Sequence, residues 1–321
     1  MSPAVELRGI DSPVVQAGMG GGLARHDLAA AVSEAGGLGT LGILDSEALR
    51  RELAAARRLT DRPIAINLLL PFARREQFEV AADADALFTF WGRPRRHTAG
   101  LWVHQCGSVQ EALEARAAGA DAVIAQGVEA GGHVRGTEPA LDLLERVRHA
   151  VGPTYPVLLA GGIADRDDVR TALDAGATAA VLGTRFLMTD ESRAHPAYKQ
   201  RLMESRETVL TELFGAGWAG ATHRVLWNEA AERWLTSDHR GPAAVRAANR
   251  ALSPALARLP YKMQDAVSRF QRASLPLLGP VAPTDDGPRN LLDAGPLYAG
   301  ESVARIYDVL PAAEVVRALT P

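Results

Sequence analysis

Short apolar runs recur along the chain up to about residue 189, and alanine-rich, partly charged stretches separate them. A short run without polar alternation is typical of a strand that is buried on both faces. Three of the separating stretches end in Ala-Gly, at Gly36, Gly119 and Gly176, where a helix C-terminus favours a left-handed residue. We predict eight strands, at residues 13–17, 38–43, 63–69, 86–91, 101–105, 122–126, 156–160 and 179–182.

Alternating helices and strands predict a parallel sheet covered on both faces, and eight units favour closure into a barrel. The rival is an open, doubly wound sheet that binds a dinucleotide. Its glycine fingerprint fails here, because Leu23 occupies the place of the third glycine after Gly18 and Gly20. We therefore expect an α/β fold, a TIM (β/α)8 barrel with an inserted, mainly helical cap domain. The barrel is predicted at residues 1–189 plus 288–321, and the cap, or substrate domain, at 190–287.

Composition narrows the classes of protein. The 321 residues carry a net charge of −3, which gives no electrostatic case for nucleic acid or an anionic membrane as partner. The single cysteine, Cys106, fits a reducing compartment. Residues 1–13 do not resemble a signal peptide, and no apolar run reaches the length of a membrane span. We expect a cytoplasmic protein. The first of only two lysines is Lys199, so no barrel strand can supply a Schiff base.

The residues after the sixth predicted strand are the first candidate site. They read Gln126-Gly-Val-Glu-Ala-Gly131-Gly132-His133 and follow an apolar run directly. Two adjacent glycines let the backbone pass close to a flat ligand, and a histidine can move a proton near neutral pH. A plain turn with a surface histidine is the simpler interpretation of these residues alone. We take His133 as the candidate catalytic residue.

The other predicted strand ends carry neutral amides and glycines. Asn67, Gln105 and Gln126 can each donate and accept hydrogen bonds, as the polar edge of a flavin requires. Each is explained equally well as support for loop backbone. Glu129 is the one carboxylate close by, so a two-acid glycosidase is excluded, and no set of metal ligands is present. Such a rim suits an organic cofactor that brings its own reactivity.

Glycines at the last two strand ends predict a phosphate site. Gly161 and Gly162 follow the seventh strand, and Gly183 and Thr184 follow the eighth. Barrels commonly bind phosphate with the loops after these two strands, although the glycines alone also fit tight turns. One phosphate site favours FMN over FAD or NAD.

Several of these stretches together resemble the nitronate monooxygenase family, formerly called 2-nitropropane dioxygenases. They are residues 16–21, 35–42, 126–133, 160–163 and 182–187, and the resemblance runs from residue 13 to about 228 and again over 297–304. It implies an FMN-containing barrel with a helical second domain, and it implies His133 as the catalytic histidine. We expect the cofactor-binding residues to be Ala17, Gly18, Met19, Asn67, Gln105, Gln126, Gly131, Gly161, Gly162, Gly183 and Thr184. Trp91 departs from the family pattern, because it puts a bulky indole at the end of the fourth strand.

The function expected from this resemblance is oxidation of alkyl nitronates by O2 to a carbonyl compound and nitrite. Two alternatives stay open, an NAD(P)H-dependent flavin reductase of quinones or enoyl thioesters and a flavin-binding sensor. The reductase would need basic residues for the nicotinamide cofactor, and Arg93, Arg95 and Arg96 offer them unless they form a solvated loop. Gln105 stands where some reductases carry a lysine, which favours the monooxygenase. The oligomeric state is left open, with a homodimer as one option.

Overall fold

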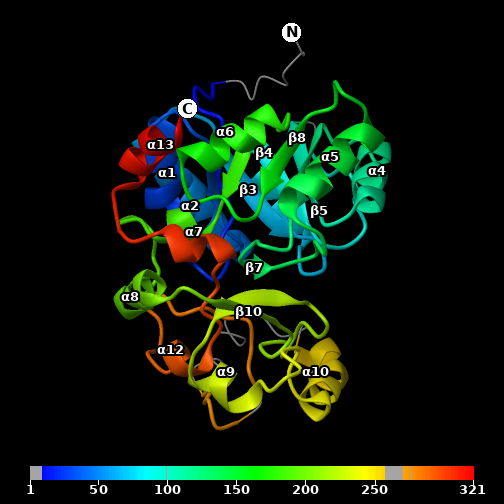
Figure 1. Ribbon diagram of the computed structural model, residues 1–321. Coiled ribbons are helices and arrows are strands. Elements are labelled where there is room, and N and C mark those ends of the chain that lie inside the picture. The colour runs from blue at the N-terminus through cyan, green and yellow to red at the C-terminus, as the bar shows by residue number, and fades with distance from the viewer. Residues whose placement is uncertain (1–8, 99, 257–269, 276) are drawn as a thin grey trace.

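The computed structural model describes residues 9–98, 100–256, 270–275 and 277–321. Eight parallel strands form a sheet in the order β1-β9-β8-β6-β5-β4-β3-β2. A parallel bridge between Val15 and Leu38 joins the two edges, and Gln16 N donates to Leu38 O at 2.9 Å, so the sheet closes into a barrel. Figure 1 shows the barrel as the upper body. The strands are β1 (Val14–Gln16), β2 (Gly39–Leu41), β3 (Ile64–Leu69), β4 (Ala86–Phe90), β5 (Leu101–Cys106), β6 (Ala122–Gln126), β8 (Val157–Ala160) and β9 (Ala180–Leu182).

This arrangement confirms the TIM barrel and all eight predicted strands. The three glycines predicted to end helices have positive φ angles of 93°, 89° and 90° at Gly36, Gly119 and Gly176. The helices that surround the barrel are α1 (His26–Glu34), α2 (Ser46–Leu59), α3 (Arg75–Ala81), α4 (Val109–Ala117), α5 (Ala140–Val151), α6 (Arg166–Asp174), α7 (Thr184–Leu187) and, from the C-terminal tail, α13 (Ala312–Leu319).

Two apolar clusters fill the barrel body. One packs the outer faces of the strands against the helices and includes Leu28, Ile66 and Leu144. The other comes from the strands and their flanks, with Phe88 and Ile124 among its members, and fills the barrel interior. Because the interior is packed with side chains, ligands have access only to the ends of the strands. None of the helices in the described ranges combines the length and apolarity needed to cross a membrane.

A second lobe lies below the barrel in Figure 1 and is mainly helical. Its helices are α8 (Pro196–Glu204), α9 (Glu229–Trp234), α10 (Ala243–Leu256) and α12 (Leu291–Ala294). It also contains a small antiparallel sheet in the order β10-β11-β7, made of β10 (Thr208–Thr211), β11 (His223–Leu226) and β7 (Gly132–His133). The strand β7 comes from the barrel, directly after the loop that follows β6. One sheet therefore holds the two lobes together.

The sequence predicted the helices of this lobe better than its strands. The helix α8 ends at Glu204, and β10 follows it. In the segment 241–278, α10 is helical and residues 270–275 are not, while 257–269 and 276 lie outside the described residues. Most of the N-terminal segment 1–13 and Lys262 also lie outside them. We propose residues 190–287 as the cap, together with α12, which packs against α9. The chain then returns to the barrel at the 3-10 helix η1 (Glu301–Arg305).

Candidate active site

A cavity of about 920 Å³ lies at the carboxyl ends of the barrel strands and extends to the cap. The barrel contributes strand ends and the loops after them, and the cap contributes Ala216, Gly217 and Trp218. Every site residue predicted from the sequence lines this cavity, namely Ala17, Gly18, Met19, Asn67, Gln105, Gln126, Gly131, His133, Gly161, Gly162, Gly183 and Thr184. The fold thus brings together residues that are up to 167 positions apart in the chain, from Ala17 to Thr184.

Asn67, near the end of β3, lies against the loop that follows β1. Its Nδ2 donates to Gly18 O at 3.3 Å. A Cβ at Gly18 would stand 2.3 Å from Asn67 Cβ, which is far inside van der Waals contact. Glycine is therefore required at position 18 by the close approach of the asparagine. The pair forms one wall of the cavity.

Gln126 fixes the strand that carries His133. Its Nε2 donates to His133 O at 2.9 Å, and its Oε1 accepts from Arg135 N at 3.0 Å. The amide therefore spans the backbone on either side of Val134 and orients β7 over the cavity. One N–H and one lone pair of the amide are left by these two bonds. The side chain thus supports loop backbone and also lines the cavity.

Aromatic rings surround the His133 imidazole. Trp218 stacks on it with ring centroids 4.0 Å apart and 28° between planes, and Tyr298 lies 5.5 Å away. Neither ring nitrogen of His133 has a hydrogen-bond partner among the described residues. Burial, together with the nearby His223, holds the pKa of His133 well below its usual value near 6.5. The imidazole is therefore neutral at pH 7, with one nitrogen able to accept a proton and the other able to donate a hydrogen bond.

His223 is held in one tautomer by the backbone. Its Nδ1 donates to Ala221 O at 2.8 Å, and its Nε2 accepts from Phe214 N at 3.3 Å. The assignment follows because a carbonyl can only accept and an amide N–H can only donate. Burial lowers the pKa of His223 to about 4, so this ring is also neutral. No local pattern in the sequence marks this residue, because its role depends on the pairing of β11 with β7.

Trp91 is the one non-glycine residue with a positive φ, 64°, in the part of the chain that the structure describes. For a bulky residue this conformation costs on the order of 1–3 kcal/mol. The indole stands at 4.9 Å from Trp218, and the Arg135 guanidinium lies 4.8 Å above its ring. Trp91 does not line the cavity itself. It supports Trp218 from behind, which gives the unexpected indole a structural role.

Glu129, Cys106 and the three arginines at 93, 95 and 96 do not line the cavity. Both oxygens of Glu129 accept from Ala140 N, at 3.1 and 3.0 Å, so this carboxylate caps α5. Cys106 is fully buried, and burial raises the pKa of its thiol far above the usual range, so it is not a nucleophile. Arg96 pairs with Asp121 at 2.7 Å.

The glycines after β8 and β9 leave backbone donors free at the cavity. Gly161 and Gly162 have φ angles of 117° and 75°, and neither the Gly162 nor the Gly183 N–H has a hydrogen-bond partner in the described ranges. A Cβ at Gly183 would meet only Ala17 Cβ, at 3.8 Å. Thr184 Oγ1 accepts from Gly300 N at 2.9 Å, which attaches the C-terminal tail to the second of these loops. Open donors of this kind suit an anion.

A closed barrel, a cavity at the carboxyl ends of its strands and a neutral histidine in it that has no hydrogen-bond partner among the described residues define a barrel enzyme. The family model described as nitronate monooxygenase matches residues 1–90 and 93–321. The chain belongs to this family, whose members are flavin-dependent oxidoreductases.

The chain is also similar to individual proteins, in sequence or in structure. The nitronate monooxygenase of Pseudomonas aeruginosa is 32% identical, over 98% of this chain and 96% of its own. Among solved structures, FabK from Thermotoga maritima superposes with a TM-score of 0.77 at 28% identity, over 99% of this chain and 94% of its own. The nitroalkane oxidase of Streptomyces ansochromogenes gives 0.74 at 30% identity, over 97% and 95%.

Proposed function

We propose that the protein oxidises alkyl nitronates with O2 to a carbonyl compound and nitrite, using one non-covalently bound FMN. The observation that carries the proposal is His133, a neutral imidazole that lines the cavity without a partner among the described residues. Membership of the nitronate monooxygenase family supports the same reaction.

The residues that line the cavity suit both polar ends of FMN, its phosphate and the polar edge of its flavin ring. The Gly162 and Gly183 N–H groups have no hydrogen-bond partner among the described residues and can donate to a phosphate, and glycine lets a ligand approach the backbone closely. Asn67 and Gln126 each retain hydrogen-bonding capacity at the cavity, and the side chain of Gln105 is free among the described residues. We propose that these amides hold the edge of the flavin ring. When bound, FMN would supply the electron acceptor that the protein side chains lack.

His133 has two tasks in this proposal. With a nitronate it donates a hydrogen bond to a nitro oxygen and holds the anion over the strand ends. With a neutral nitroalkane its basic nitrogen removes the proton from the carbon that bears the nitro group, and the electron pair stays on the substrate. Since the pKa of His133 is depressed, the base is unprotonated at pH 7 and ready to accept that proton.

Trp218 and Tyr298 shape the space around the substrate. Both line the cavity beside His133, and their rings exclude water from one side of the imidazole. The Tyr298 hydroxyl donates to Pro280 O at 2.9 Å, and burial raises the pKa of this phenol well above its usual value. Tyr298 is therefore neither acid nor base in the reaction. His133 is the only group we assign to proton transfer.

The test begins with the purified protein. We expect a yellow preparation that releases FMN on denaturation and consumes O2 and forms nitrite from a nitronate without NAD(P)H. Rapid anaerobic bleaching by NADH would instead favour the reductase. The three arginines considered for that function do not line the cavity. A colourless protein that FMN cannot reconstitute would refute the cofactor assignment.

A further inference from the structure

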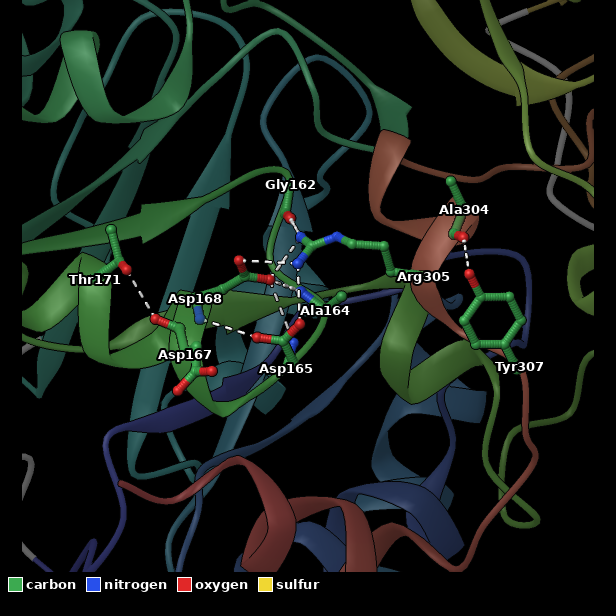
Figure 2. Close-up of polar contacts among 9 residues, drawn as sticks. All are labelled: Gly162, Ala164, Asp165, Asp167, Asp168, Thr171, Ala304, Arg305 and Tyr307. Atoms are coloured by element: carbon green, nitrogen blue, oxygen red, sulfur yellow. Dashed lines mark hydrogen bonds and ion pairs between the residues drawn. The ribbon is translucent and has the colours of Figure 1, made fainter.

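The loop between β8 and α6 is held from outside by an arginine of the C-terminal tail. Figure 2 shows the Arg305 side chain, at the end of η1, reaching this loop. Its Nη2 donates to Gly162 O at 2.9 Å and to Asp168 Oδ2 at 2.6 Å. Its Nη1 donates to Asp165 Oδ2 at 2.9 Å and to Asp168 Oδ1 at 3.1 Å. One guanidinium thus binds the loop backbone and two carboxylates at once.

The same carboxylates hold the loop to α6. Asp168 Oδ2 accepts from Ala164 N at 2.7 Å and from Asp165 N at 3.3 Å. Asp165 Oδ1 accepts from Asp168 N at 3.0 Å, which completes a capping box at the start of α6. These bonds are drawn in Figure 2. Arg305 therefore binds the loop through Gly162 and through Asp165 and Asp168, the two residues of the capping box at the start of α6. These hydrogen bonds and the capping box form one network.

The contact with Gly162 sets the direction of the next amide. In a trans, planar peptide the C=O and the following N–H point in opposite directions. Because the Gly162 carbonyl points to Arg305, the Ile163 N–H points away from it. Ile163 lines the cavity, and its N–H has no partner among the described residues. Arg305 thus fixes a peptide unit whose donor is free for a ligand.

Charge gives Arg305 a second task. The start of α6 carries Asp165, Asp167 and Asp168 next to the loop that we assign to phosphate. Carboxylates at this place would repel a phosphate dianion, because like charges a few ångströms apart raise the free energy. Asp167 pairs with Arg170 at 3.3 Å, and Arg305 pairs with the other two aspartates. The tail therefore supplies the positive charge that the loop itself lacks.

We propose that Arg305 is a positioning residue for the FMN phosphate. It fixes the peptide unit from Gly162 to Ile163 and neutralises the carboxylates behind it, without itself contacting the isoalloxazine end of the cavity. This inference rests on the proposed function in one respect, the identity of the cofactor. It adds that the C-terminal tail, distant in sequence from the loop, determines how tightly the phosphate is held.

The test compares two flavins that differ by the phosphate alone. Apoprotein is titrated with FMN and with riboflavin, and binding is followed by quenching of flavin fluorescence. We expect Arg305→Gln to weaken FMN binding by about tenfold, the size of one lost charge-assisted hydrogen bond, and to leave riboflavin binding unchanged. Arg305→Lys keeps the positive charge but loses the planar guanidinium that binds Gly162 O and both carboxylates at once. Its FMN affinity should therefore lie between that of Arg305→Gln and the wild type.

Arg170→Gln is the matched control. It removes the same charge from the same acidic cluster, but among the described residues the Arg170 guanidinium pairs with Asp167 and makes no hydrogen bond to the loop backbone. We expect its FMN affinity to change much less than that of Arg305→Gln. Equal FMN affinity of Arg305→Gln and wild type would overturn the inference, as would an equal loss of FMN and riboflavin. If the wild-type apoprotein binds neither flavin, the FMN assignment fails, and this inference fails with it.

Discussion

His133 and His223 stand directly opposite each other on the paired strands β7 and β11, with ring centroids 5.3 Å apart. One histidine belongs to the barrel loop and the other to the cap. The pairing places the cap segment with Trp218 over the His133 ring, because β11 follows that segment within a few residues. The position of the cap is therefore set by the same strand that carries the proposed base.

The first prediction separates the two tasks of His133. In His133→Asn, turnover of neutral nitroalkanes should fall by about 10²–10⁴-fold, because an amide cannot accept a proton at neutral pH. Turnover of pre-ionised nitronates should be largely retained, because the Asn amide still donates a hydrogen bond. Initial rates of O2 uptake with both substrate forms measure the difference.

Flavin content must equal that of the wild type for this comparison. His149→Asn is the matched control, since His149 is exposed on α5. If both substrate forms lose activity together, His133 binds the anion and is not the base. Wild-type rates on both would make it an ordinary turn residue.

The second prediction concerns acid stability. Burial, with a further contribution from Arg135, lowers the pKa of His104 to about 4, and burial lowers the pKa of His223 to the same value. Both histidines therefore bind a proton more readily in the unfolded chain. Between pH 6.5 and 4 the unfolded state holds more protons, so the free energy of unfolding falls as the pH is lowered. Each histidine contributes about 3 kcal/mol to this loss.

His104 allows a clean measurement of this slope. Trp102 Nε1 donates to Thr89 Oγ1 at 2.7 Å, and a second hydrogen bond, also of 2.7 Å, joins Thr89 Oγ1 to His104 Nδ1. In His104→Asn the side-chain amide can take the place of Nδ1 in this bond, through its oxygen or its N–H, while the titration disappears. Urea denaturation from pH 7 to 4 should then show a shallower decline than in the wild type. An unchanged slope would show that His104 does not contribute.

The local pattern of apolar residues and glycines predicted the barrel, but it did not predict the small sheet of β10, β11 and β7. The eight barrel strands are apolar runs, and glycines such as Gly119 mark the helix ends before them. The strand β7 has two residues, Gly132 and His133, and so it has no periodicity to detect. Its existence depends on pairing with β11, about ninety residues later, which is a tertiary contact. Short strands in the cap were missed for the same reason.

The candidate site likewise combines residues that a local sequence pattern predicts with residues that no local pattern predicts. Residues at strand ends were predictable, since parallel strands bring their carboxyl ends to one side of a barrel. Trp218, His223 and Arg305 reach the site from the cap and the tail, and no local pattern marks them. For Arg305 one signal existed, the aspartates Asp165, Asp167 and Asp168 beside the proposed phosphate loop, which outnumber the arginines of the same stretch, Arg166 and Arg170.

The third prediction tests the close approach of Gly18 and Asn67. Gly18→Ala would put a Cβ 2.3 Å from Asn67 Cβ, so either the segment around residue 18 or the Asn67 side chain must move. We expect a loss of about 1–3 kcal/mol in the free energy of unfolding, which is typical of overpacking. Gly183→Ala is the control, since its Cβ would find only a 3.8 Å contact. Chemical denaturation of both variants measures the difference, and equal stability would contradict the prediction.

The fourth prediction uses charge at the phosphate loops. Gly183→Asp and Gly162→Asp should bind FMN at least about tenfold more weakly, because a carboxylate then faces the phosphate. Gly183 is the cleaner position, since Gly162 has a φ of 75° and any side chain there adds backbone strain. Gly183→Ala separates charge from size. Full flavin content in both aspartate variants would mean that these glycines serve only as turns.

The fifth prediction concerns Trp218, whose ring covers one face of His133 at 4.0 Å. In Trp218→Ala the space beside the imidazole grows, so nitronates with longer alkyl chains should gain in kcat/KM relative to short ones. A pocket distinguishes one methylene by roughly 10–200-fold, which sets the size of the largest expected shift. Trp227→Phe is the control, because Trp227 lies in the cap and does not line the cavity. Steady-state rates over a series of linear nitronates measure the preference. A chain-length profile identical to that of the wild type would show that Trp218 shields the imidazole from water without selecting the substrate.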